Sequence, residues 1–437
     1  MLIVQEDTPA FAEALARIAE RGETDHARVE PEVREILAAV RKEGDVALLR
    51  YAQRFDHRTP APILRRAFPG AEALARLPAH TREALELAAI RIRRFHERQK
   101  DAGFRYSEEG VTLGSRVRPL DRVGVYAPGG KARYPSSVLM SAVPAQVAGV
   151  RDILLVTPLA GDDTDDAIYA CAHLAGVTGL VDLGGAHAIG AVAYGTATVP
   201  RVDKIVGPGN AYVACAKRLV FGRVAIDGIA GPSEILVVAD DEADPQLVAA
   251  DLLSQAEHDE AAYPLLVCSS ISMAEAVSEQ VREQLSTLPR IAIASASVAA
   301  NGIAFVARSR ARMAELADTI APEHLSLQVR DPEGLLGLIR HAGAVFLGPL
   351  TPEAAGDYVA GPSHVLPTGG TVRFGSPLGV YDFYARTSVL SYSADALAKQ
   401  GGAIATFARL EGLEGHARAV EVRTIRSGGL RGTPSRG

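Results

Sequence analysis

The sequence predicts an α/β fold with two mostly parallel sheets and helical segments at both ends of the chain. Short apolar runs alternate with helical patterns from residue 121, and a second alternation of this kind begins at residue 234. Such alternation is typical of βαβ units around a parallel sheet. Outside these regions, apolar residues recur at helical spacing both near the start of the chain and after residue 382.

The N-terminal part of the chain shows three amphipathic helical patterns, at residues 10–21, 33–55 and 81–100. Long helices of this kind mostly pack against other elements, so we expect them to be scaffold. A further helical stretch spans residues 394–423. The Gly-, Ser-, Pro- and Arg-rich residues 426–437 are expected to form a disordered tail.

The segments expected to form the sheets lie between these helical ends. The first group of strand-like runs occupies residues 123–127, 152–158, 179–185 and 202–210. The second group occupies residues 234–240, 264–270 and 343–350. The sequence therefore predicts two sheets, one of which interrupts the other along the chain.

Composition and charge limit the class of protein. The 437 residues suggest two or three domains, and 48% hydrophobic with 22% charged residues exclude a disordered chain. A net charge of −6 argues against recruitment of nucleic acid or of an anionic membrane, and we expect no transmembrane segment or signal peptide. Three cysteines in apolar surroundings predict reduced thiols in a cytoplasmic protein, and without a C-x-x-C motif any zinc must use nitrogen and oxygen ligands.

Two short segments carry side chains suited to catalysis or metal binding. In residues 244–259, Asp244 is expected to cap a helix on which Gln255 and His258 share one face near the C-terminal end. This pair could bind a metal or could simply decorate a surface. In APEHLSLQV, the adjacent Glu323 and His324 suit a general-base pair, or else an exposed acid beside a partly buried histidine.

Two further segments contribute candidate ligands. The Gly- and Pro-rich residues 354–370 contain Asp357, Tyr358, Ser363 and His364, which could hold a metal or substrate or could belong to an ordinary surface loop. EGLEGHARAV contains Glu411 and His416, which alone are a weak signal. Nitrogen and oxygen donors without thiolate fit a catalytic zinc.

The signals for nucleotide binding are unusual. No G-x-G-x-x-G follows the early strands, and GPGNAY at residues 207–212 begins like that motif but ends in Tyr212. VGVYAPGGKARYPSSVLM predicts a strand, a Gly-rich loop and a helix with Ser136 or Ser137 near its start. Backbone amides there could bind a pyrophosphate, or the loop could be only a tight connection.

Nine short segments, in this order, resemble the histidinol dehydrogenase family. They are FHERQ, VGVYAPGG, YPSSVLM, KIVGPGNAYV, AGPSE, DLLSQAEH, APEHL, GDYVAGPSHVLPTGG and EGLEGHA, and the resemblance covers roughly residues 20–430. Nine segments in register are highly specific. The resemblance implies zinc-dependent oxidation of L-histidinol to L-histidine through bound L-histidinaldehyde, in two NAD-dependent steps that end histidine biosynthesis.

The resemblance also implies the residues of the site. Four residues match the family's ligands for one Zn²⁺ per subunit: Gln255, His258, Asp357 and His416. Glu323 and His324 match the catalytic pair. The substrate-contacting positions are these zinc ligands and His324 together with Ser233, His364 and Glu411, and the NAD-contacting positions are Tyr126 and Asn210.

The domain organisation that we expect has two incomplete Rossmann-like domains with helical extensions at both ends. The larger domain is expected at 23–125 and 234–378, with most zinc and catalytic residues, and the second domain at 126–233, with the NAD contacts. The two ends are an N-terminal helical extension at 1–22 and a C-terminal helical segment at 379–437. The resemblance implies a homodimer in which this last segment crosses over. Glu411 and His416 would then complete the partner's active site.

Two positions depart from the family pattern. His187 stands in GGAHAIG where Gln is usual at an NAD-contacting position, and Ser363 stands where Asn is common. One alternative function is that of a paralogous zinc- and NAD-dependent dehydrogenase acting on another alcohol, such as a sulfonated propanediol, but the segments GDY and GPSE favour histidinol. Two others are a zinc hydrolase, which would act without NAD, and an inactive binding protein, which the intact ligand set disfavours.

Overall fold

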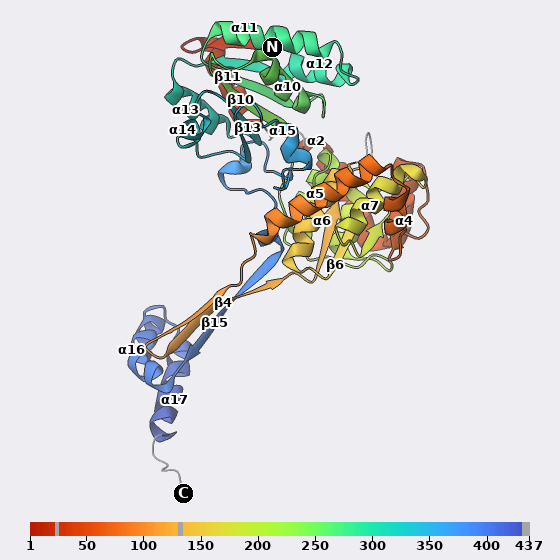
Figure 1. Cartoon of the computed structure of the whole chain (residues 1–437). Helices are drawn as coiled ribbons and strands as arrows, with labels where there is room; N and C mark the ends of the chain where they lie inside the picture. Colours follow the sequence, from red (N-terminus) through yellow and green to blue (C-terminus); the bar gives the residue numbers. More distant parts are fainter. Residues whose placement is uncertain (22–25, 130–133, 431–437) are drawn as a thin grey trace. The chain divides into compact units, whose positions relative to one another are not determined.

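The computed structural model describes residues 1–21, 26–129 and 134–430, which fall into two units. The first unit contains residues 1–100 and 120–383, and the second contains residues 101–119 and those that follow residue 383. In the described part of the chain, no helix combines the length and the apolar character needed to cross a membrane. The predicted α/β class is confirmed, because the first unit contains two largely parallel sheets with flanking helices (Figure 1).

One sheet of the first unit has six parallel strands in the order β1-β12-β11-β10-β13-β14. These strands are β1 (Leu2–Gln5), β10 (Glu234–Ala239), β11 (Tyr263–Cys268), β12 (Ile303–Val306), β13 (His324–Gln328) and β14 (Ala344–Leu347). Along β10, Leu236 and Val238 enter one hydrophobic cluster, while Ile235 and Val237 enter another. Both faces of this strand are buried, which explains its continuous apolar sequence.

Helices cover both faces of this sheet (Figure 1). The face of Leu236 is covered by α1 (Pro9–Ala19), α13 (Arg310–Ile320) and α14 (Pro332–Leu336). The opposite face is covered by α10 (Pro245–Ala256), α11 (Ile271–Leu285) and α12 (Ile291–Asn301). The short helix α15 (Glu353–Tyr358) contacts α10, with Ser254 near the end of α10 hydrogen-bonded to Glu353.

The second sheet has the order β2-β7-β6-β5-β8-β9, and its strands are parallel except for the antiparallel edge strand β2. The strands are β2 (Leu64–Arg65), β5 (Arg122–Tyr126), β6 (Asp152–Val156), β7 (Gly179–Val181), β8 (Lys204–Val206) and β9 (Ala225–Ile226). The chain runs from β5 outward to β7 and then returns to β8 on the other side of β5. The strand order thus reverses between β5 and β8.

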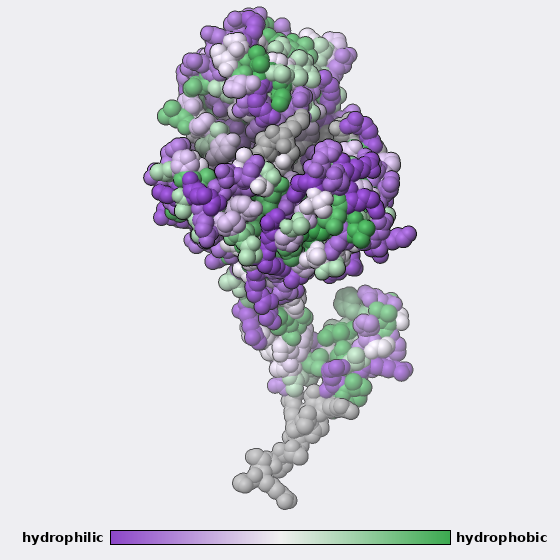
Figure 2. All heavy atoms as spheres, turned by 90° about the vertical axis from the view of Figure 1, so that its right-hand side faces the viewer, coloured by the Kyte–Doolittle hydropathy of each residue, from purple (hydrophilic) through white to green (hydrophobic). Residues whose placement is uncertain are grey.

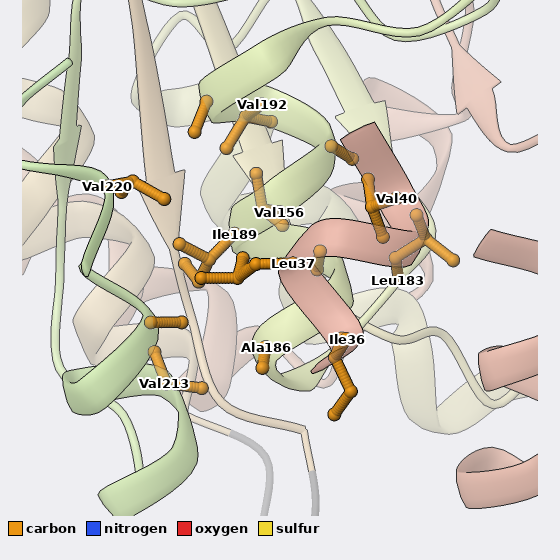
Figure 3. Packing of buried hydrophobic residues seen from close by; sticks show 14 of the residues in the cluster. Ile36, Leu37, Val40, Val156, Leu183, Ala186, Ile189, Val192, Val213 and Val220 are labelled. Carbon is orange, nitrogen blue, oxygen red and sulfur yellow. The ribbon is translucent and has the colours of Figure 1, made fainter. Parts of the chain in front are cut away.

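The helices of this second sheet include those predicted near the N-terminus. One hydrophobic cluster joins the sheet to α2 (His26–Glu43), α3 (Asp45–Asp56), α8 (Gly185–Tyr194) and α9 (Ala211–Val220). In it, Ile36, Leu37 and Val40 of α2 pack beside Ile189 and Val192 of α8 (Figure 3). A second group of contacting helices comprises α4 (Gly70–Arg76), α5 (Ala79–Glu97), α6 (Pro135–Ala148) and α7 (Asp166–Leu174), of which α6 contacts β5 and β6.

The second unit is small. Its three antiparallel strands, in the order β15-β4-β3, are β3 (Phe104–Glu108), β4 (Val111–Pro119) and β15 (Tyr384–Tyr392). Glu109 and Gly110, both with positive φ, form the two-residue turn between β3 and β4, as the twist of a hairpin requires. Helices α16 (Ala394–Leu410) and α17 (Glu414–Leu430) complete the unit, and short 3₁₀ turns elsewhere span Asp163–Asp165, Thr371–Arg373 and Val380–Phe383.

Several segments differ from the sequence-based expectations. Residues 1–21 include an edge strand as well as a helix, because β1 pairs with β12 and α1 packs into the core of that sheet. Helices α2 and α3 pack on the second sheet rather than on the sheet of residues 234–378, since their apolar faces fit α8 and α9. β15 forms in a stretch expected to be helical, and α17 continues into the expected tail, of which residues 431–437 lie outside the described part.

Candidate active site

The start of strand β13 carries two adjacent titratable side chains, Glu323 and His324. Helix α13 ends at Ile320, and Ala321 then takes a left-handed conformation with φ 48°, which turns the chain toward the strand. Because β13 lies beside β10, both side chains reach the backbone of Glu234. The Glu234 amide donates to Glu323 Oε2 over 3.0 Å, and the Glu234 carbonyl oxygen lies 2.9 Å from His324 Nδ1.

These backbone contacts define the proton state of His324. A carbonyl oxygen can only accept, so the proton of the neutral ring lies on Nδ1 and Nε2 keeps its lone pair. Burial lowers the pKa of His324 to about 4, which keeps the ring neutral near pH 7. Burial and then the charge of Glu234 raise the pKa of Glu323 well above its ordinary value. The pair therefore offers one ready proton acceptor and one carboxyl group of unusually high basicity.

Two more carboxyl groups face His324 Nε2. Glu353 Oε1 lies 3.5 Å and Asp357 Oδ1 lies 3.9 Å from this nitrogen, and both residues belong to α15, one turn apart. The possible ligand atoms of the three residues all lie within 4.8 Å of one another. Burial raises the pKa of both carboxyl groups, and the charge of Asp357 raises that of Glu353 further. A bound cation would favour the ionised forms in such a cluster.

The end of helix α10 contributes donors that fit a metal. As expected, Asp244 caps the helix, and Gln255 lies fully buried in its last turn. Neither polar atom of the Gln255 amide has a hydrogen-bond partner in the described part of the chain, which is costly unless a ligand supplies one. His258 Nδ1 lies 3.4 Å from Ser233 Oγ, and burial lowers the pKa of His258. A neutral imidazole, an amide oxygen and a carboxylate are donors that zinc accepts.

His364 approaches the same centre from the loop after α15. Its Nδ1 donates to the Asp357 carbonyl oxygen over 3.1 Å, and its Nε2 lies 3.4 Å from Ser137 Oγ. In the same loop, Ser363 Oγ donates to the Met140 carbonyl oxygen over 3.1 Å. Ser137 and Met140 belong to α6 of the second sheet, so the candidate site lies where the two sheets of the first unit meet.

The remaining candidates of the first unit lie at the carboxyl edge of the second sheet. Tyr126 ends β5, and its hydroxyl accepts a hydrogen bond of 3.0 Å from the Gly185 amide. Asn210 caps α9 after the loop that follows β8. A Cβ at Gly207 in this loop would lie 2.1 Å from the Tyr126 carbonyl oxygen, so only glycine permits this approach. β5 and β8 flank the reversal of strand order, where ligands bind in open α/β sheets.

Comparisons with known proteins agree with this geometry. The chain matches the family model described as histidinol dehydrogenase over residues 19–424. It is 52% identical over 426 residues to a histidinol dehydrogenase of Syntrophotalea carbinolica, covering 97% of this chain and 99% of that protein. It is 50% identical over 424 residues to one of Lactiplantibacillus plantarum, covering 97% and 99%. The chain belongs to the histidinol dehydrogenase family.

A solved structure extends this match to the fold. The crystal structure of a histidinol dehydrogenase from Elizabethkingia anophelis has a TM-score of 0.91 and 34% identity, with 98% of each chain covered. These matches confirm the expected family. As a member of this family, the protein is an NAD-dependent oxidoreductase. Glu323, His324, Asp357, His258, Ser233 and His364 are brought together by the contacts described above, and Gln255 joins them through α10.

Two of the expected site residues of this family member belong to the other unit. Glu411 lies directly after α16, and His416 lies in the first turn of α17. Both side chains are exposed. The first unit alone therefore contains three of the four expected zinc ligands and both residues of the expected catalytic pair.

Sequence reasoning missed two buried acids of the site, Glu353 and Glu234. Glu353 is 1% exposed and accepts a hydrogen bond of 3.1 Å from Ser254 Oγ. In the sequence it reads as an ordinary acid in the first turn of a helix, and only its spacing of four residues from Asp357 hints at a shared face. Glu234 is also 1% exposed. The segment AGPSE indicates Ser233 as a site residue, but it gives no sign that the adjacent Glu234 takes part.

The Gly-rich loop expected to receive a pyrophosphate is only partly described, since residues 130–133 lie outside the described part. His187, the departure from the family pattern, is 1% exposed in α8. Its ring centroid lies 5.9 Å from that of Tyr51 and 6.2 Å from that of Phe55, both on α3. Neither ring nitrogen has a hydrogen-bond partner in the described part of the chain. This histidine is therefore built into helix packing.

The burial of His187 predicts a specific sensitivity to acid. Burial and the charge of Arg58 lower its pKa to about 4, so between this value and the ordinary 6.5 the unfolded chain binds a proton that the folded protein does not. Stability thus falls as the pH drops through this window, and His187 contributes about 2 kcal/mol of the loss between pH 7 and pH 5. Denaturant unfolding measures the free energy of unfolding at pH 7 and at pH 5. The decrease between these two values should be smaller in His187→Gln than in the wild type by this amount. The same change at the exposed His80 is the control, and an unchanged loss in His187→Gln would refute the prediction.

Proposed function

We propose that the protein oxidises L-histidinol to L-histidine through bound L-histidinaldehyde, with two molecules of NAD and one Zn²⁺ per subunit. It would act in the cytoplasm at the end of histidine biosynthesis, with no nucleic-acid or membrane partner. The observation that carries the proposal is the position of His324 at the start of β13: its Nε2 lone pair lies beside Glu353 and Asp357, and its Nδ1 lies beside Glu323. Family membership supports the substrate, because the relatives named above are histidinol dehydrogenases.

The donor set fits the implied metal. Gln255, His258 and Asp357 would hold zinc together with His416. Two observations support this assignment: the Gln255 amide has no hydrogen-bond partner among the described residues, and the pKa of Asp357 is raised. Bound zinc supplies a Lewis acid that can hold the amino group and an imidazole nitrogen of the substrate. Tyr126 and Asn210 would contact NAD at the reversal of strand order, and bound NAD accepts one hydride in each step.

The chain's own residues then move the protons. His324 Nε2 accepts the hydroxyl proton as hydride leaves the carbinol carbon, which gives the aldehyde. Glu323 in its ionised form takes a proton from the water that adds to the aldehyde, and a second hydride leaves the resulting hydrate anion to give the carboxylic acid. Four electrons leave the substrate and two NADH form. Ser233, His364 and Glu411 orient the substrate, and Glu411 can accept a hydrogen bond from its imidazole N–H.

The second unit supports a homodimer with shared sites. Its own core is small, with a buried cluster of only Ala405, Ala408 and Ala417 among its described residues. Large apolar side chains stay exposed instead, and they gather on the helical part of this unit in Figure 2. The most exposed are Phe104, Leu390, Phe407, Leu410 and Ile425, at 63%, 65%, 70%, 78% and 74%. A partner subunit would cover this surface and would receive Glu411 and His416.

Removal of the metal tests the proposal. We expect L-histidinol to support NADH formation, and we expect a chelator to abolish it while the protein stays folded by circular dichroism. Zinc added back to one equivalent per subunit should restore the rate, with the metal content measured in parallel. NADH formation from histidinol that survives complete loss of metal would contradict the assigned metal, and turnover of a sulfonated propanediol alone would contradict the substrate.

A further inference from the structure

A buried ion pair lies behind the catalytic pair. Arg21 follows helix α1, and Glu234 begins strand β10, 213 residues later in the sequence. Arg21 Nε donates to Glu234 Oε1 over 2.9 Å, and a terminal nitrogen donates to Oε2 over 2.7 Å. Both side chains are 1% exposed. This is a bidentate contact of the geometry that a guanidinium makes best with a carboxylate.

The same two side chains hold three other segments. Arg21 also donates to the Ile18 carbonyl oxygen over 2.7 Å and to the Ala321 carbonyl oxygen, in the turn before Glu323, over 3.4 Å. Glu234 Oε1 accepts a hydrogen bond of 2.8 Å from the Gly369 amide, in the loop that carries His364. The end of α1, the turn before β13 and the loop of residues 361–370 therefore meet at this ion pair.

The backbone of Glu234 is what holds the catalytic pair. Its amide and carbonyl group are the partners of Glu323 Oε2 and His324 Nδ1. A movement of Glu234 would shift the Glu323 carboxylate. It would also break the hydrogen bond from His324 Nδ1 that fixes the tautomer with a free lone pair on Nε2. Stability alone is a weak reason for such a pair, because replacing both partners of a buried ion pair by well-packed apolar side chains of similar volume is often close to neutral for folding.

We propose that Arg21 and Glu234 are positioning residues for the oxidation: their ion pair fixes the first residue of β10 so that its backbone orients Glu323 and His324. The inference rests on the roles proposed for that pair. Neither Arg21 nor the Glu234 carboxylate has to touch substrate. A displacement of catalytic groups by about 1 Å can lower a rate by about a hundredfold, so the geometry of this contact should appear in kcat.

The test replaces both partners together. In Arg21→Gln/Glu234→Gln, no charge is left buried alone, so the variant should melt close to the wild type. We expect kcat for histidinol to fall at least about tenfold. The dissociation constant of histidinol, measured by calorimetry without NAD, should change by less than about threefold, since the expected metal and substrate ligands keep their places. A matched control is Arg76→Gln/Asp166→Asn, which removes a bidentate pair between α4 and α7 and should keep the wild-type kcat.

Three outcomes would overturn the inference. They are a wild-type kcat in the folded double variant, a loss of histidinol affinity as large as the loss of kcat, and an equal loss of kcat in the control. If the double variant does not fold, Arg21→Lys keeps the charge without the bidentate contact, and a wild-type kcat in that variant would also overturn it. His324→Ala in the same assay separates the two proposals, because an active His324→Ala enzyme would refute the catalytic roles themselves.

Discussion

Replacement of His324 by alanine lowers kcat for histidinol oxidation by about a thousandfold, within the range expected for loss of a general base. The reason is the single free lone pair at Nε2, which no other neutral nitrogen in the described contacts of the pair replaces. Steady-state rates of NADH formation measure the effect, and histidinol binding by calorimetry shows whether the site stays intact. The control is His341→Ala, which should keep its activity, because His341 is a half-buried histidine whose backbone amide donates to Asp318.

A second substitution separates base catalysis from packing. Asparagine at position 324 can keep a side-chain N–H directed at the Glu234 carbonyl oxygen, but it has no acceptor in place of Nε2. We therefore expect His324→Asn to be as inactive as His324→Ala. Activity above about a tenth of the wild type in either variant would contradict the assignment of His324 as the base.

A mixture of two inactive variants regains activity if the sites are shared. His324 belongs to the first unit and His416 to the second, so a dimer of one His324→Ala and one His416→Ala subunit has one site with both defects and one with neither. Random mixing makes half of the dimers mixed, which predicts about a quarter of the wild-type activity. Each variant alone should be almost inactive.

Mixed dimers can be isolated with two different affinity tags and should show about half of the wild-type activity. The control is a mixture of His324→Ala with His258→Ala. Both of these residues lie in the first unit, so every site carries one defect and no activity should return. Mixed His324→Ala and His416→Ala dimers without activity would contradict a site completed by the partner.

The sequence alone predicts much of this fold because burial leaves a pattern. Residues 235–239 of β10, ILVVA, are apolar at every position since helices cover both faces, and the capping Asp244 marks the start of α10. β15 leaves no such pattern, because seven of its nine residues are exposed and its sequence YARTSVLSY mixes polar and apolar side chains without alternation. Amphipathic helices such as α2 reveal that one face is buried, but they do not reveal which sheet covers it.

The site shows the same limit. Glu323, His324, Gln255 and His258 could be proposed because they stand in short, distinctive segments. Arg21 could not, because an arginine after a helix is an ordinary surface residue until the tertiary fold buries it against Glu234. The contact between these two residues, 213 positions apart, depends on how α1 packs against the sheet that contains β10, which local sequence patterns do not encode.

Counting the NADH formed per histidinol consumed tests the central claim most directly. The proposed two-step oxidation predicts two NADH and one histidine for each histidinol, with no free aldehyde detected by a trapping reagent. One NADH per histidinol, with aldehyde released, would contradict the role given to Glu323 in the second step. The absence of NADH from folded, zinc-loaded protein would contradict histidinol as the substrate.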